Sequence, residues 1–126
     1  MTFSKTDELI IDRQSTPEGV LILRITGWLT LKNKASFEDA LDKTQGQNVV
    51  LDLPGLQYMD SAGLGSLLKG YVAAQKYGGK LALAGLLPRV RDLLQLTKIE
   101  PLFQIYPTAA EAVAAFAKSA GAAPAT

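Results

Sequence analysis

The residue types and the position of the pair Asp60-Ser61 fit either a helix N-cap or a site of serine phosphorylation. The pair precedes a run of leucines at helical spacing, where a helix N-cap is expected. One interpretation is a plain N-cap, whose side chain accepts hydrogen bonds from free amides at the positive end of the helix dipole. The other is a phosphorylation site at Ser61, where a phosphate would add about −1.5 to −2 charges at pH 7. The helix start tolerates that charge, whereas a docked partner surface opposes it.

Two glycines, Gly63 and Gly65, follow in the first turn of the same predicted helix. Each costs about 1 kcal/mol relative to alanine inside a helix. Their presence therefore predicts that another backbone or a partner surface comes close to this helix start.

Ser-His-Asp catalysis, Cys-His catalysis and zinc sites built from imidazole or thiol are excluded, because the chain contains no cysteine and no histidine. A carboxylate-only site stays possible, but no tight cluster of Asp and Glu occurs along the sequence. The stretch Ser66-Leu67-Leu68-Lys69 has the S-x-x-K spacing of some acyl-transfer enzymes, but their companion motifs are missing. Gly63-Leu64-Gly65 lacks the third glycine of a dinucleotide fingerprint, and no Ser or Thr follows Lys80 as a phosphate loop requires. We expect no enzyme activity, no cofactor and no metal site.

The elements that must position Asp60-Ser61 form one domain of class α/β. The chain has 126 residues, of which 48% are hydrophobic and 20% charged, a balance typical of a folded domain of this size. Its apolar pattern predicts the order β-β-α-β-α-β-α-β-α, with a central mixed β-sheet packed against α-helices. The strands are predicted at 9–11, 20–25, 49–53, 81–84 and 103–106, and the helices begin near residues 35, 61, 88 and 108.

Particular residues define these elements. The turn formers of 15–19 predict an antiparallel hairpin whose second strand ends at Gly27. Thr108 and Glu111 form a capping box. Two helices carry predicted core-facing stripes, one made of Leu64, Leu67, Leu68, Tyr71 and Val72, the other of Val90, Leu93, Leu94 and Leu96.

In such sheets functional loops lie beyond the carboxyl ends of the strands. That rule predicts a site made by the loops after Ile25, after Leu53 and after Ala84.

Charge and hydropathy indicate whether the protein binds nucleic acid, crosses a membrane or is secreted. Thirteen basic and twelve acidic residues are interspersed and give a formal net charge of +1, which argues against nucleic-acid binding. No apolar run approaches the roughly 18 residues of a membrane span, and Asp7 and Glu8 lie where a secretory signal would be apolar. We expect a cytoplasmic monomer without membrane insertion, with its domain at 1–118 and a flexible tail at 119–126.

From about Val20 to Phe116 the sequence resembles the anti-sigma-factor antagonists, small bacterial proteins of the STAS fold. The core of the resemblance is the Asp-Ser-x-Gly-Leu-Gly motif at this point in the strand and helix order. The matching residues are Gly27, Val49-Val50-Leu51-Asp52-Leu53, Met59-Asp60-Ser61-Ala62-Gly63-Leu64-Gly65, Gly78-Gly79-Lys80-Leu81, Pro88-Arg89-Val90 and the stretch from Leu94 to Phe103.

The resemblance implies a partner switch. Unphosphorylated members bind an anti-sigma factor that is also a serine kinase of the histidine-kinase-like ATPase type, and thereby release a sigma factor. The kinase phosphorylates the serine directly after the motif aspartate, here Ser61, and a PP2C-type phosphatase removes the phosphate. The residues that the resemblance and the loop positions nominate for partner binding are Gly27, Trp28, Leu29, Thr30, Asp60, Ser61, Ala62, Gly63 and Gly65.

This sequence departs from the family at two places. Members often carry acidic residues after the glycine that ends the second strand, whereas here that glycine is followed by Trp28-Leu29-Thr30. Trp28 is either a contact anchor for a partner or a cover for one edge of the core. Ala62 stands where many members have a second Ser or Thr, which leaves Ser61 as the single acceptor in the loop.

Two other functions stay open at the level of sequence. The missing acid favours a constitutive STAS subunit of an ABC lipid-transport complex or of a signalling scaffold. Binding of a small ligand or nucleotide at the same loops has little beyond the fold in its favour.

Overall fold

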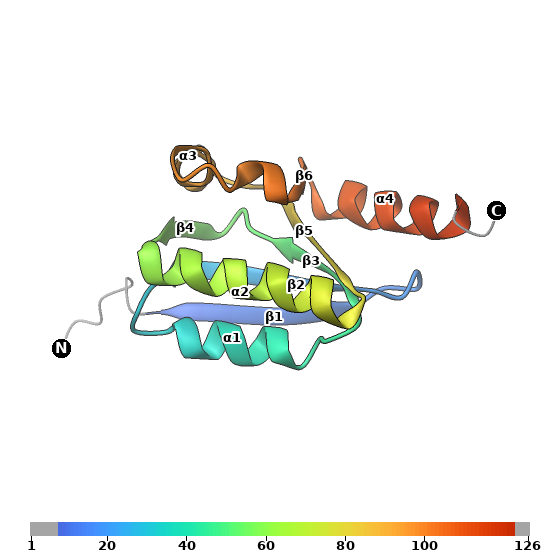
Figure 1. The fold of residues 1–126 in the computed structure, drawn as a ribbon, viewed down its shortest axis with the longest axis horizontal. Helices are drawn as coiled ribbons and strands as arrows, with labels where there is room; N and C mark the ends of the chain where they lie inside the picture. The colour runs from blue at the N-terminus through green and yellow to red at the C-terminus, as the bar shows by residue number, and fades with distance from the viewer. Residues whose placement is uncertain (1–7, 123–126) are drawn as a thin grey trace.

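A computed structural model describes residues 8–122, and side chains for residues 8–118. The described part forms one mixed sheet with helices on both faces (Figure 1). The strands are β1 (Leu9–Ser15), β2 (Val20–Leu29), β3 (Asn48–Asp52), β4 (Leu56–Met59), β5 (Lys80–Ala84) and β6 (Gln104–Tyr106). The helices are α1 (Lys34–Asp42), α2 (Ser61–Tyr77), α3 (Pro88–Leu96), the short 3₁₀ turn η2 (Glu100–Leu102) and α4 (Ala109–Ala122).

The sheet has the strand order β1-β2-β3-β5-β6. The hairpin strand β1 runs antiparallel to β2, as predicted, and every other pairing is parallel. The predicted α/β class and the order of strands and helices are confirmed. The strand β4 is an addition to that order, because the sequence pattern left its residues in a loop.

β4 exists because β2 is longer than predicted. β2 continues past Gly27 to Leu29, beyond the last residue of β3, and this extension offers free backbone groups to a neighbouring strand. β4 takes that place, pairing Trp28 with Tyr58 and Leu29 with Met59 after a bulge at Gly27. The sheet is thereby extended to the residue directly before Asp60.

Alternation along the strands divides the core between the two faces of the sheet. α1 and α2 cover one face and α4 the other, while α3 packs against β4 near the carboxyl ends of the strands (Figure 1). Along β2, for example, Leu21, Leu23 and Ile25 belong to the cluster under α1 and α2, whereas Val20 and Ile22 contact the cluster under α4.

The predicted helix stripes are wrong at their ends. Val72 is 60% exposed and Leu96 is 80% exposed, although both fit an apolar stripe by spacing. α2 contacts α1 as well as the sheet, and its inward face carries Ser66 and Gly70, whose small size lets α1 approach. Val72 is therefore turned outward.

At the carboxyl end, α4 extends to Ala122 and thus includes the first four residues of the segment 119–126 that we expected as a tail. The remainder, 123–126, lies outside the described residues. The predicted cap of this helix is present, since the amide of Glu111 donates to the Thr108 hydroxyl at 3.1 Å. Among the described residues, no helix is long and apolar enough to cross a membrane.

The different environments of two leucines on α3 lead to a test of this packing. Leu94 is fully buried and Leu96 largely exposed. Leu94→Ala is expected to lower the free energy of unfolding by about 2–5 kcal/mol because it leaves a cavity, and Leu96→Ala by no more than about 0.5 kcal/mol. Urea denaturation of both variants measures these values. Equal losses would contradict the outward position of Leu96.

Candidate functional site

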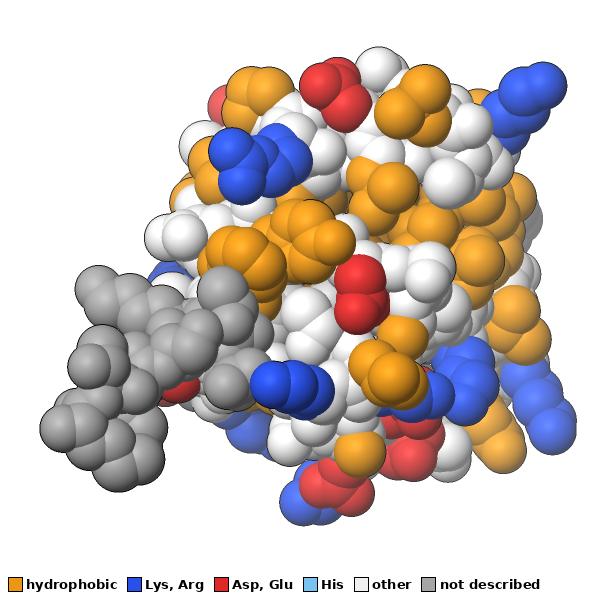
Figure 2. Space-filling model, turned by 90° about the vertical axis from the view of Figure 1, so that its left-hand side faces the viewer, with side chains coloured by type: hydrophobic (Ala, Val, Ile, Leu, Met, Phe, Trp, Pro, Cys, Tyr) orange, Lys and Arg blue, Asp and Glu red, His pale blue; other side chains and the backbone are white. Residues whose placement is uncertain are grey.

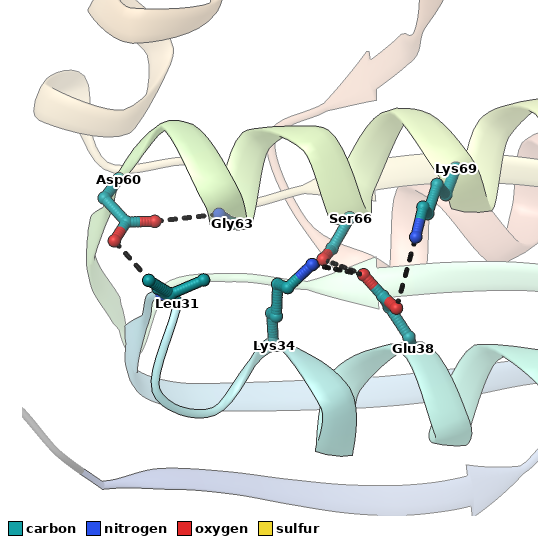
Figure 3. Close-up of polar contacts among 7 residues, drawn as sticks. All are labelled: Leu31, Lys34, Glu38, Asp60, Gly63, Ser66 and Lys69. Atoms are coloured by element: carbon teal, nitrogen blue, oxygen red, sulfur yellow. Dashed lines mark hydrogen bonds and ion pairs between the residues drawn. The ribbon is translucent and has the colours of Figure 1, made fainter.

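Asp60 forms the predicted N-cap and also links two loops. Its backbone is extended, and its Oδ1 accepts a hydrogen bond of 2.8 Å from the amide of Gly63 in the first turn of α2. Its Oδ2 accepts a second hydrogen bond of 3.1 Å from the amide of Leu31, in the loop that follows β2 (Figure 3). One carboxylate therefore fixes the start of α2 against the loop between β2 and α1.

The loop between β2 and α1 is closed by Asn33, which the sequence analysis did not single out. The Asn33 side chain accepts from the Thr30 amide at 2.9 Å and donates to the Trp28 carbonyl at 2.8 Å. Asn next to a helix start favours such local bonds, which is the signal that could have identified it.

The nominated segment 27–30 divides into supporting and surface residues. Gly27 has a φ of +113°, and a Cβ there would collide with the Glu8 carbonyl, so this glycine is required by the approach of β1. Leu29 is buried in the core. Trp28 is half-buried and its ring lies 4.5 Å from that of Tyr58, centroid to centroid, on the neighbouring strand. Trp28 and Thr30 thus remain the members of this segment that can reach a partner.

The two glycines of α2 have different roles. Gly63 is buried, and a Cβ there would collide with the Leu29 carbonyl, so the predicted close approach is made by the chain's own backbone. A Cβ at Gly65 would meet nothing within 4 Å, and Gly65 is exposed. Gly63 therefore supports the site from beneath, while Gly65 leaves open space on the surface.

Ser61 is the first residue of α2 and is exposed, with Ala62 half-buried beside it. Among the described residues, its hydroxyl makes no hydrogen bond to another residue. This hydroxyl therefore faces solvent at the helix start and takes part in no hydrogen bond of the described fold.

A surface hollow of about 700 Å³ opens beside Ser61. One wall is formed by residues 58–61 with Leu64, and the other by α3, which carries Arg89 and Leu93 on this side. Figure 2 views this end of the molecule and shows hydrophobic side chains across its middle with charged ones scattered around them.

The structure brings together two of the three loops in which the sequence predicted a site. The loops after β2 and β4 meet at Asp60, and the loop after Ala84 leads into α3 and contributes through that helix. Sequence reasoning did not nominate Tyr58, Arg89 or Leu93 as site residues, because only the folded chain brings them beside Ser61.

A polar cluster holds α2 against α1 one turn further along. The hydroxyl of Ser66, which is buried, donates to the Glu38 carboxylate, and Lys34 and Lys69 lie 3.9 and 3.5 Å from its two oxygens (Figure 3). The Ser66 hydrogen bond lowers the pKa of Glu38; the lysines contribute in the same direction, and burial opposes them. The S-x-x-K pair of the sequence, Ser66 and Lys69, therefore converges on one carboxylate with a structural role.

Comparison with known proteins shows the family of the chain. The sequence profile of the STAS domain matches residues 14–112. The chain is 34% identical over 92 residues to the anti-sigma F factor antagonist of Paenibacillus polymyxa, covering 70% of this chain and 79% of that one.

Solved structures are similar in fold. An anti-sigma factor antagonist from Mycobacterium paratuberculosis superposes with a TM-score of 0.73 at 23% identity, over 86% of this chain and 94% of that one. The Bacillus cell fate determinant SpoIIAA in its phosphorylated form gives 0.67 at 19% identity, over 85% and 99%.

The two α2 glycines provide a matched pair of substitutions. Gly63→Ala is expected to destabilise the fold by about 1–3 kcal/mol, because its methyl group must displace the Leu29 backbone. Gly65→Ala is expected to stabilise it by up to about 1 kcal/mol, since alanine is the better helix former and meets open space. Thermal or urea unfolding gives both signs, and a stabilising Gly63→Ala would refute the close approach.

The Glu38 cluster predicts how stability depends on pH. Because the folded state lowers the pKa of Glu38, it favours the carboxylate. The resulting stabilisation is present above the unfolded-state pKa of about 4.3 and is lost as the pH falls through the lower folded-state value. The advantage of wild type over Glu38→Gln, measured by urea unfolding between pH 7 and pH 3, should be constant above about pH 5 and shrink below pH 4.3.

Ser66→Ala supplies the control, because it removes the main cause of the shift. A carboxyl ¹³C NMR titration should show a higher Glu38 pKa in this variant than in wild type. An unchanged titration would assign the shift to the lysines instead.

Proposed function

We propose that this chain, which belongs to the STAS domain family, is an anti-sigma-factor antagonist that Ser61 switches between a binding and a non-binding state. In the unphosphorylated state it binds an anti-sigma factor and thereby releases a sigma factor. Phosphorylation of Ser61 abolishes that binding.

The observation that carries the proposal is the exposed Ser61 hydroxyl at the first residue of α2, directly after an aspartate that anchors two loops. A relative 34% identical in sequence bears the name of an anti-sigma F factor antagonist. A protein of similar fold has been solved in a phosphorylated form. Both facts support the same role for this chain.

The physical basis of the switch is electrostatic. Ser61 follows Asp60, so a phosphate would place about −1.5 to −2 charges beside an existing carboxylate. On the free protein this charge lies in water at the positive end of a helix and costs little. Under a docked partner it must be desolvated next to a like charge, which opposes binding.

The partners follow from the family resemblance. The anti-sigma factor is a serine kinase of the histidine-kinase-like ATPase type, and a PP2C-type phosphatase restores the binding form. The anti-sigma factor contacts a surface that consists of Trp28, Thr30, Asp60, Ser61 and Gly65. Binding, phosphorylation and dephosphorylation take place in the cytoplasm.

The alternative, a constitutive subunit of a transport or scaffold assembly, is favoured by one observation. The segment after Gly27 carries no acid and presents Trp28 instead. In that role Ser61 would be a helix residue without regulatory meaning, so its substitution would leave the partner unchanged.

Substitution of Ser61 separates the two functions. Ser61→Ala and Ser61→Asp proteins serve as paired baits in the native lysate, and the retained ATPase is then purified for titration. Ser61→Asp is expected to bind it at least about tenfold more weakly than Ser61→Ala, because the added carboxylate must be desolvated beside Asp60. Incubation of wild type with the ATPase and ATP should add one phosphate, located at Ser61 by mass spectrometry.

Ser36→Asp is the matched control, since it places the same charge on an exposed serine of α1. It should bind like wild type. Equal affinities of Ser61→Ala and Ser61→Asp, or retention of the same transporter or scaffold component by both, would sink the switch and favour the fixed subunit.

A further inference from the structure

The hollow between α2 and α3 contains an arginine that has no partner among the residues the structure describes. Arg89 lines the same hollow as Ser61, from the opposite wall. Among the described residues, no ion pair or hydrogen bond engages its guanidinium. Arg91 on the same helix differs, since its Nε lies 2.8 Å from Glu100.

The position of Arg89 in α3 leaves its charge uncompensated. It is the second residue of the helix, after Pro88, and the first turn contains no acid. A cation at a helix N-terminus is opposed by the helix dipole, so Arg89 gains from any anion brought into the hollow. The fold fixes its location, because its neighbour Val90 is buried in the core and anchors the first turn of α3.

The other charged groups lining the hollow are Asp60 and Asp92. Both oxygens of Asp60 already accept backbone amides, from Gly63 and Leu31. Asp92 lies one turn after Arg89 on α3, yet no ion pair joins the two. A phosphate on Ser61 would be a stronger acceptor than either carboxylate, because it carries about two charges on three oxygens that match the fork of a guanidinium.

We propose that Arg89 is the intramolecular receptor of the Ser61 phosphate, closing the hollow between α2 and α3 in the phosphorylated protein. The proposal rests on the proposed function for the presence of the phosphate and deepens it by naming the residue that holds it. Phosphorylation then has two effects: it adds charge beside Asp60, and it covers the apolar side chains on the two walls, Leu64 and Leu93. The phosphorylated surface is thereby closed as well as repulsive.

The test uses the full chain with phosphoserine incorporated at position 61 during synthesis, so that no kinase is needed. The ³¹P NMR titration of the phosphate reports its second pKa, which a neighbouring guanidinium lowers. Arg89→Gln is expected to raise that pKa by about half a unit, as loss of an exposed ion pair does. Arg89→Lys, which keeps the charge but not the fork, should fall between the two.

Arg91→Gln is the matched control, because that arginine is engaged with Glu100 and does not line the hollow. It should titrate like wild type. Identical phosphate titrations of wild type and Arg89→Gln, or an equal shift in Arg91→Gln, would overturn the proposal. Either result would refute the role of Arg89 but not the proposed phosphorylation switch. Failure of the kinase to phosphorylate Ser61 would refute the switch, while the titration would still show whether Arg89 binds the phosphate.

Discussion

The carboxylate of Asp60 joins two segments that the sheet alone would leave independent. Its two oxygens bind one amide in the first turn of α2 and one in the loop after β2. Each bond is of the charge-assisted kind and satisfies a backbone donor that helix and strand geometry leave free. Position and orientation of Ser61 follow from this double anchor, because Ser61 is the next residue along the chain. An uncharged cap with a single acceptor would hold the helix but release the loop.

The anchor works because the backbones beneath it are close. β4 continues the sheet to Met59, directly before Asp60, and pairs with the extension of β2 that ends at Leu29. Gly63 then packs its Cα against the Leu29 carbonyl, where no side chain fits. A glycine in the first turn makes the helix less stable, but Gly63 offsets this loss because it allows the contact with Leu29 and donates its amide to the Asp60 cap. The site is therefore a rigid corner between a strand pair and a helix.

Sequence reasoning located this corner but not its surroundings, for a physical reason. Asp60 as cap and the hairpin of β1 and β2 depend on residues near one another in the chain, so local rules predict them. β4 depends on where β3 ends relative to β2, which no local pattern encodes. Val72 and Leu96 both fit apolar helical stripes by their spacing, yet both are exposed. Val72 is turned outward because α2 packs against α1, and Leu96 lies at the open hollow instead of in the core. Burial is a tertiary property, and spacing alone overestimates it.

Under the proposed switch, the same corner explains why phosphorylation of Ser61 would act on binding and not on folding. Among the described residues its hydroxyl makes no hydrogen bond, so the folded state loses no contact when the hydroxyl becomes a phosphate ester. A modification that is nearly neutral for the free protein can change an equilibrium only through its different free energy in the complex. That difference is large where the phosphate would be desolvated beside Asp60, and larger still if a guanidinium holds it over the surface that a partner needs. The proposed switch can therefore be reversible, because the protein would remain folded with and without a phosphate on Ser61.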